Sequence, residues 1–285
     1  MKKNKNRIYL LALLPFIVVT FLFELIPLIM IIFNSFMPEG SFGFTLEHYK
    51  DIFTKALYQR AIINSILISL TSSIIGIIIA FFGGMAVHQV GNGSKIKNAF
   101  LTVLNMTSNF AGVPLAFAYM ILLGNSGLMV QFGKDFGIDA LANYNLYTSG
   151  GLRLIYVYFQ IPLSTLLLIP AFEGIRHEWQ EAATLMGARN AQFWYKIGVP
   201  ILLPSILGTV SVLFANALAA YATAYALLMN NYALLPINVS GMFVGDVTQR
   251  KEMGGALSVI MMILMVCAIL INNAITNRSR RGVAR

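Results

Sequence analysis

Long runs of apolar residues dominate the chain, and short polar segments separate them. A helix rises 1.5 Å per residue, so about 20 residues are needed to cross the roughly 30 Å hydrocarbon layer of a bilayer. Runs of that length predict six transmembrane helices. We place them near residues 8–33, 61–87, 99–123, 152–172, 201–229 and 255–275. The pattern therefore predicts an all-α, polytopic membrane protein.

Composition supports a chain whose main solvent is lipid. Of the 285 residues, 58% are hydrophobic and only 11% are charged, whereas a soluble domain has about 25% charged residues. The apolar core of a signal peptide has roughly 7–15 residues. The first apolar run of this chain is much longer, and no small-residue cleavage pattern follows it. We expect it to remain in the membrane.

The distribution of Lys and Arg predicts the orientation of the spans. Thirteen of the 20 lie in four alternate segments: the start of the chain, residues 88–98, the segment between the fourth and fifth spans, and the tail. The other seven are matched by seven acids in the remaining segments. Because basic loops resist translocation, the first set is predicted to be cytoplasmic, together with both termini. The scattered basic residues have no interleaved aromatic platform, so they do not predict nucleic-acid binding.

The three segments on the other side, 34–60, 125–151 and 230–254, are long enough to carry short interfacial helices. Apolar residues three to four apart over 44–53, after a helix-start signal at Thr45, favour one such helix. A simple connecting loop is the alternative.

Sequence signatures of an ATP site or a metal site are missing. The segment from Gly91 to Lys95 does not fit the G-x-x-x-x-G-K-[ST] pattern of a phosphate-binding loop. The single cysteine, Cys267, lies in an apolar run, and the three histidines lie in separate segments. The chain is therefore predicted to bind no cofactor and no metal.

The cytoplasmic segment between the fourth and fifth spans, residues 173–200, has a pattern of its own. It is rich in helix formers and is interrupted by Gly187 and Gly198. We predict a short helix, a turn at Gly187 where the backbone takes a positive φ, and a second helix that leads into the fifth span. Gly198 is expected to be a second break. Pro200 and Pro204 suit the first turns of the following span.

The spacing within this segment is that of a docking motif. Glu181, Ala182 and Ala183 are followed by Gly187, by Ile197 nine residues later, and by Pro200. This register resembles the EAA signature of the membrane-spanning permease subunits of binding-protein-dependent ABC importers. Val199 stands where that family more often has Leu. The charge distribution independently puts the motif on the cytoplasmic side, where ATP is.

The resemblance implies a type I importer permease fold and a set of partners. Residues 1–60 would form an N-terminal transmembrane helix and first extracytoplasmic segment, 61–275 the permease core, and 276–285 a basic cytoplasmic tail. The motif, with Met186, would form the coupling helix that docks on a cytoplasmic ABC ATPase dimer, which binds ATP and Mg²⁺. A second permease subunit and an extracytoplasmic solute-binding protein would complete the complex. We expect the second permease to be a related chain, and a second copy of this chain is the alternative. The expected location is the bacterial inner (plasma) membrane, and the overall look is nearest the spermidine/putrescine, iron, sulfate and phosphonate branch.

Polar residues inside the predicted spans are candidates for a substrate pathway, because such groups are costly in lipid. We predict that Asn109, Gln160 and Asn216 line the path, and that the third helix is locally broken near Gly112 and Pro114. Glu24 is a candidate contact for a cationic substrate. The alternative for each is a structural role: hydrogen bonding between helices for the amides, and a protonated or ion-paired side chain for Glu24.

A second class of function also fits six spans, namely a secondary transporter or channel driven by an ion gradient. That class needs acidic residues deep in the spans to carry the coupling ion, and Glu24 is the one acid available. A membrane-embedded enzyme would need a paired nucleophile and base, which the pattern does not offer. The identity of the substrate does not follow from the sequence.

Overall fold

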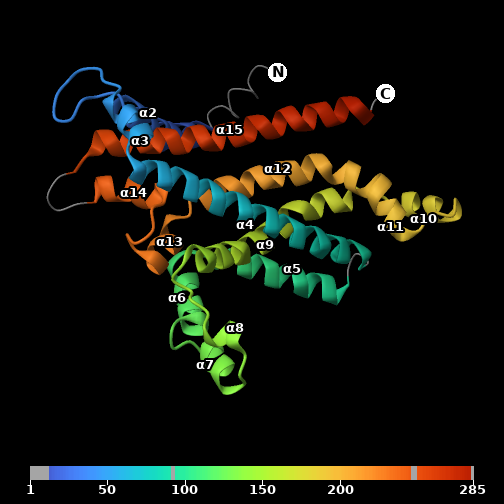
Figure 1. The fold of residues 1–285 in the computed structure, drawn as a ribbon. Helices are drawn as coiled ribbons and strands as arrows, with labels where there is room; N and C mark the ends of the chain where they lie inside the picture. The colour runs from blue at the N-terminus through green and yellow to red at the C-terminus, as the bar shows by residue number, and fades with distance from the viewer. Residues whose placement is uncertain (1–12, 91–93, 245–248, 284–285) are drawn as a thin grey trace, which may run out of the picture. The chain divides into compact units, whose positions relative to one another are not determined.

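The computed structural model describes residues 13–90, 94–244 and 249–283, with side chains up to residue 276. These residues form helices and connecting segments without strands. Six helical stretches are long and apolar enough to cross a membrane: Leu13–Asn34, Ala56–Gln89, Gly112–Asp135, Ser149–Glu173, Asn190–Leu218 and Lys251–Thr276. The predicted all-α fold with six spans is therefore confirmed (Figure 1).

The chain divides into two compact units, and the first comprises Met1–Gln59 and Asn238–Ile263. Its first span contains the π-helical turn η1 (Phe21–Leu25) and α2 (Ile26–Asn34), with a proline in the first turn of α2. Then α3 (Glu47–Thr54) follows, and the Thr45 hydroxyl accepts a hydrogen bond from the Glu47 N–H at 3.2 Å. The short helix predicted over 44–53 is thus present.

Polar contacts connect the segment after α2 to other parts of this first unit. The Tyr49 hydroxyl donates to Ser35 Oγ at 2.8 Å, and His48 Nε2 is 2.9 Å from the Met37 carbonyl oxygen. Arg250, just before α15 (Lys251–Val283), pairs with Glu39 at 2.5 Å. These contacts tie residues distant in sequence into one unit.

The second unit, Arg60–Ile237 with Leu264–Arg285, is built around three long helices. These are α4 (Ala56–Gln89), α9 (Ser149–Glu173) and α12 (Val199–Leu218), which run alongside one another in Figure 1. A Cβ atom added to Gly76 on α4 would lie only 2.8 Å from Gln160 Cβ on α9. The absence of a side chain at Gly76 therefore lets the two helices approach closely.

The helix predicted over 99–123 is two helices, α5 (Lys95–Ser108) and α6 (Gly112–Leu123). Residues 109–111 are not helical, and Gly112 has φ +73°. The predicted break is confirmed, whereas the predicted extent of the span is wrong. The apolar stretch long enough to cross the membrane begins at Gly112 and includes α6 and α7 (Leu128–Asp135). The short helix α8 (Asp139–Ala142) precedes α9.

The predicted continuous fifth span over 201–229 is also wrong. Helix α12 ends at Leu218, and a separate helix α13 (Tyr221–Leu228) follows. Helix α13 packs against α6, and the Thr223 hydroxyl donates to the Gly112 carbonyl oxygen at 3.2 Å. The two interrupted helices thus meet at their breaks. The short helix α14 (Leu235–Phe243) precedes α15.

Candidate functional site

The segment that carries the EAA register folds as a helical hairpin. Helix α10 (His177–Leu185) ends in a turn at Gly187, which has φ +85°. The Gly187 N–H donates to the Thr184 carbonyl and the Ala188 N–H to the Ala183 carbonyl, both at 2.9 Å. This paired pattern is the glycine-terminated helix end that requires a left-handed residue. The predicted helix, turn and positive φ are therefore confirmed.

The second arm of the hairpin is α11 (Asn190–Phe193), which continues through the π-helical turn η2 (Trp194–Gly198) into α12. We refer to α10, the Gly187 turn and α11 as the EAA hairpin. The predicted break at Gly198 is wrong, because the helix runs through it with φ −62°. Gly198 instead makes room for an aromatic ring, since a Cβ there would lie 2.5 Å from Trp194 Cε3. Pro200 lies in the first turn of α12, as predicted, and Pro204 lies further inside that helix.

Buried aromatic residues anchor the base of the EAA hairpin. Phe172, Phe193 and Trp194 belong to one buried cluster with Ala183, and Ile197 packs against it. The ring centroids of Phe172 and Trp194 are 5.9 Å apart. Two residues of the motif, Ala183 and Ile197, therefore hold the hairpin onto the spans.

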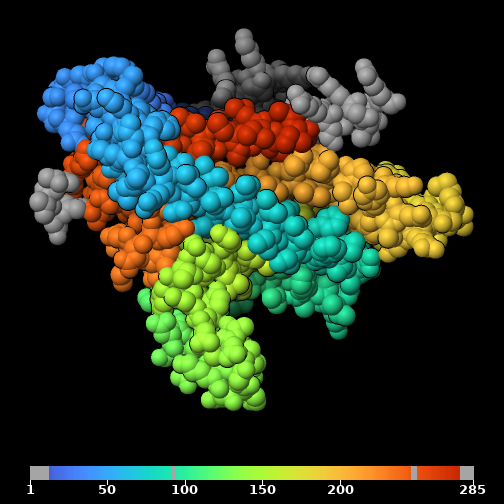
Figure 2. Space-filling view, viewed as in Figure 1, coloured from blue at the N-terminus to red at the C-terminus, as the bar shows by residue number. Residues whose placement is uncertain are grey.

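The remaining motif residues face outward. Glu181, Ala182 and Gly187 are exposed, and the apolar side chains of Leu185 and Met186 are 89% and 80% exposed. In the space-filling view this hairpin stands out at the surface of the second unit, coloured yellow (Figure 2). Large apolar side chains at such exposure are typical of an interaction surface.

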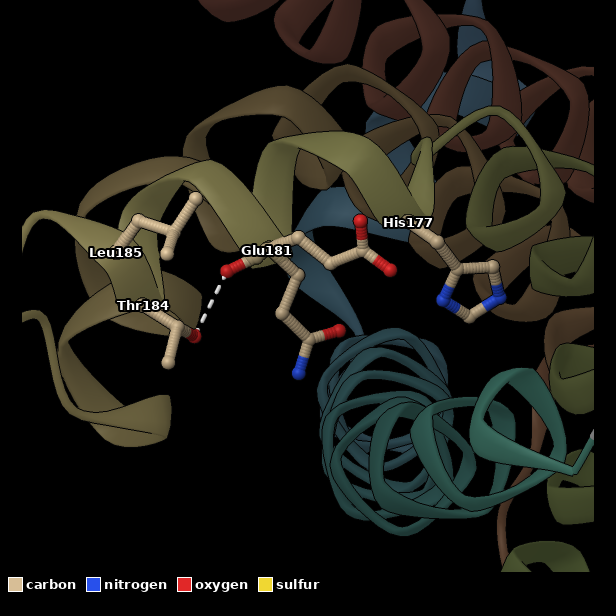
Figure 3. A pocket seen from close by; sticks show the side chains of 5 residues that line it. His177, Glu181, Thr184 and Leu185 are labelled. Carbon is tan, nitrogen blue, oxygen red and sulfur yellow. Dashed lines mark hydrogen bonds between the residues drawn. The ribbon is translucent and has the colours of Figure 1, made fainter.

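One face of α10 lines an open groove of about 550 Å³. Its lining residues are spaced by three and four positions, so they share one side of the helix. They are His177, Gln180, Glu181, Thr184 and Leu185. Figure 3 shows these side chains along α10, with the Thr184 hydroxyl donating to the Gln180 carbonyl oxygen at 2.9 Å. The groove offers a carboxylate, a carboxamide and an apolar end to a partner.

The four pathway candidates lie in different environments. Gln160 has no exposed surface and donates from Nε2 to Ser73 Oγ at 3.2 Å and to the Leu213 carbonyl at 2.8 Å. It therefore links α4, α9 and α12. Asn109 is exposed and bonds the Asn105 carbonyl of its own helix end at 2.8 Å, and Asn216 is exposed on α12.

No hydrogen bond among the described residues joins Gln160 to either asparagine. Glu24 is exposed on η1, in the first unit. The pathway assignment therefore stays a prediction for all four residues.

Sequence reasoning missed the aromatic base of the hairpin. Phe193 and Trp194 sit in a polar segment, where large buried aromatic side chains are unexpected, and that contrast was the available signal. In the part of the chain that the structure describes, no group of three or more His, Cys, Asp or Glu side chains could hold a metal ion.

Six helical spans with a polar helical hairpin between the fourth and fifth fit the arrangement expected of one class of protein, the membrane-spanning permease subunits of ABC transporters. No protein-family profile matches the chain. Individual permease proteins of that class are similar to the chain. The chain is 26% identical over 243 residues to the probable sulfate transport system permease protein of Prototheca wickerhamii, covering 82% of this chain and 90% of that protein. It is 24% identical over 254 residues to the spermidine/putrescine transport system permease protein PotB of Haemophilus influenzae, covering 87% of each.

Solved structures show the same fold. A bacterial ABC transporter involved in the import of the acidic polysaccharide alginate matches with a TM-score of 0.76 and 19% identity, covering 97% of this chain and 98% of that one. The MetNI methionine ABC transporter matches with a TM-score of 0.57 and 16% identity, covering 78% and 96%. The resemblance inferred from the EAA register is therefore confirmed: the chain is similar, over most of its length, to permease subunits of ABC importers.

Proposed function

We propose that this chain is a permease subunit of an ATP-driven importer and that the EAA hairpin is its docking element for a separate ATPase. One observation carries the docking assignment. The hairpin exposes Leu185 and Met186 at its tip while Phe193 and Trp194 hold its base in a buried cluster. A rigid base with an exposed apolar tip can transmit a push from a partner to the spans, because packed interiors resist compression.

The charge distribution supports one orientation in the membrane. We infer that both termini and the EAA hairpin are cytoplasmic, and that the membrane is the bacterial inner membrane. Thirteen of the 20 basic residues lie on that side by sequence. ATP is available there to the ATPase, and this chain supplies no ATP site of its own.

The complete transporter would contain a second permease subunit, an ABC ATPase dimer and an extracytoplasmic solute-binding protein. The similar alginate transporter has been solved with a periplasmic protein bound to alginate pentasaccharide, which supports a partner of that kind here. We infer that ATP and Mg²⁺ bind to the ATPase, whose closure moves the hairpin and alternates access across the spans. Asn109, Gln160, Asn216 and Glu24 remain our candidates for the path.

Tagging the chain and identifying co-purifying proteins tests this proposal. We expect an ABC ATPase to be recovered with the wild type and to be reduced or lost with Gly187→Trp, because a bulky side chain there strains the turn and blocks the docking surface. Gly137→Trp is the matched control, since Gly137 also has a positive φ and no atom within 4 Å of an added Cβ. Recovery of the wild-type chain alone, under conditions that preserve such complexes, would contradict the proposal and favour an ion-driven transporter.

A further inference from the structure

We propose that the stacked imidazoles of His88 and His177 position the EAA hairpin and make its coupling to the spans sensitive to pH. This inference rests on the proposed function of the hairpin. The two rings lie nearly parallel, 7° apart in plane, with centroids separated by 4.9 Å. His88 is in the last turn of α4, and His177 is the first residue of α10.

His177 belongs to both the base and the docking face of the hairpin. It shares one side of α10 with Glu181 and Leu185 in the open groove, and Figure 3 shows its ring at the end of that row of side chains. Its stacking partner His88 belongs to a transmembrane helix. A partner that moves α10 therefore moves His177 against α4 directly.

The surroundings of the pair restrict how much positive charge it can carry. Lys97 on α5 lies on the same cavity of about 450 Å³ and pairs with Glu173 of α9 at 3.2 Å. Arg176 and Glu178, on either side of His177 in sequence, also line this cavity. The charges of these two basic and two acidic side chains offset each other. The net charge around the cavity therefore depends on whether the histidines are protonated.

His88 offers few polar contacts to the pair. Its Nε2 atom is buried and makes no hydrogen bond within the described part of the chain. The Trp194 ring is nearly perpendicular to the His88 ring with centroids 6.2 Å apart, and the Phe172 centroid lies at 6.3 Å. A proton on this buried nitrogen would lack an acceptor, which is costly. The stack is therefore compatible with no more than one charged ring.

The direction of the pH dependence follows from proton linkage. Two imidazolium charges held 4.9 Å apart repel each other, so the stacked pair takes up fewer protons than two separated imidazoles, a group whose ordinary pKa is about 6.5. The separated state therefore binds more protons, and its population rises relative to the stacked state as the pH falls. The ratio of the two populations changes by up to about tenfold per pH unit below that value. Coupling should be complete above about pH 7 and weaken below about pH 6.

The first test compares variants in the purified complex. We expect the ATPase activity of the purified wild-type complex to fall severalfold more between about pH 7.5 and about pH 5.5 than that of the His177→Phe or His88→Phe complex, whose rings carry no proton. His48→Gln, which alters the remaining histidine and keeps a donor for the Met37 carbonyl, should behave as wild type. Equal pH profiles in wild type and both Phe variants would overturn the inference and leave the docking role intact, whereas failure to recover any ATPase would refute the docking role.

A second test needs no partner. The chain has two tryptophans, Trp179 and Trp194, so Trp179→Phe leaves an indole whose ring is 6.2 Å from His88. A charged imidazole quenches a nearby indole, and fluorescence of the full chain in detergent should therefore change as the pH is lowered below the ordinary imidazole value of about 6.5. We expect this change to disappear in His88→Phe and to begin at a higher pH in His177→Phe, where no second imidazole opposes a proton on the remaining ring. The same fluorescence profile with and without His177→Phe, or no change with pH at all, would overturn the role of the pair.

Discussion

Gly187 determines the shape of the EAA hairpin, because its φ of +85° allows the chain to turn immediately after α10. A residue with a Cβ in this region costs about 1–2 kcal/mol. No atom lies within 4 Å of an added Cβ, so the cost is conformational and not steric. The tight turn and the exposure of Met186 beside it both depend on this backbone state.

We predict that Gly187→Ala lowers ATPase recovery and coupled ATPase activity severalfold without preventing insertion of the chain, because the local strain is only about 1–2 kcal/mol. The measurement is ATPase co-purification and substrate-stimulated turnover. Gly137→Ala has the same positive φ and open surroundings and should leave both values unchanged. Equal effects of the two substitutions would show that the position of Gly187 has no special role in docking.

Among the helices, α4 and α9 depend on a close approach at Gly76. An added Cβ there would meet Gln160 Cβ at 2.8 Å, a distance that requires the helices to move apart. We predict that Gly76→Ala destabilises the protein by about 1–3 kcal/mol, measured as a lower unfolding temperature in detergent. Gly208→Ala on α12, with open space around the new Cβ, should be neutral or stabilising because Ala favours helix. An unchanged unfolding temperature for Gly76→Ala would contradict the tight packing.

The two interrupted helices are joined by a hydrogen bond where they meet. The Thr223 hydroxyl bonds the Gly112 carbonyl across the break, and removing such a bond between membrane helices costs about 1 kcal/mol. Thr223→Val should therefore lower the unfolding temperature slightly. Thr102→Val is the control, since Thr102 bonds only the Asn98 carbonyl in its own helix at 2.9 Å. A similar shift for both variants would argue against a contribution from this contact.

The breaks also show what the sequence could and could not predict. The interruption near Gly112 was predictable, because a glycine followed two residues later by Pro114 disfavours helix. The interruption between α12 and α13 falls at Ala219 and Ala220, residues of high helix propensity. Packing of α13 on α6 overrides that propensity, and such a contact between distant segments leaves no local signal.

The candidate site also contains features that the sequence could predict and features that it could not. The turn at Gly187 was predictable, since a positive φ is a local requirement that glycine meets. Gly198 was expected to meet a similar local need by breaking the helix, but the absence of its side chain instead accommodates Trp194 one turn away. The amide of Gln160 was visible as a polar group within a span, but its bonds to Ser73 and Leu213 depend on three helices. Spacing identifies local backbone needs and cannot identify tertiary partners.

At the scale of the whole molecule, the proposed function depends on which side of the membrane carries the EAA hairpin. The basic residues predict that residues 88–98 and the hairpin are cytoplasmic and that 34–60 is extracytoplasmic. The chain has one cysteine, Cys267, so Cys267→Ala gives a background without thiols. Ser41 and Lys95 are both exposed and lie in segments predicted to be on opposite sides.

We predict that a membrane-impermeant thiol reagent labels Ser41→Cys in intact cells and labels Lys95→Cys only after the membrane is opened. The physical reason is the cost of moving charged segments across the bilayer, which favours retention of Lys and Arg on the cytoplasmic side. The Cys267→Ala chain without an added cysteine gives the background labelling. The reverse pattern would place the EAA hairpin on the side without ATP, and docking on an ATPase through Leu185 and Met186 would then be impossible whatever the similarity of the fold.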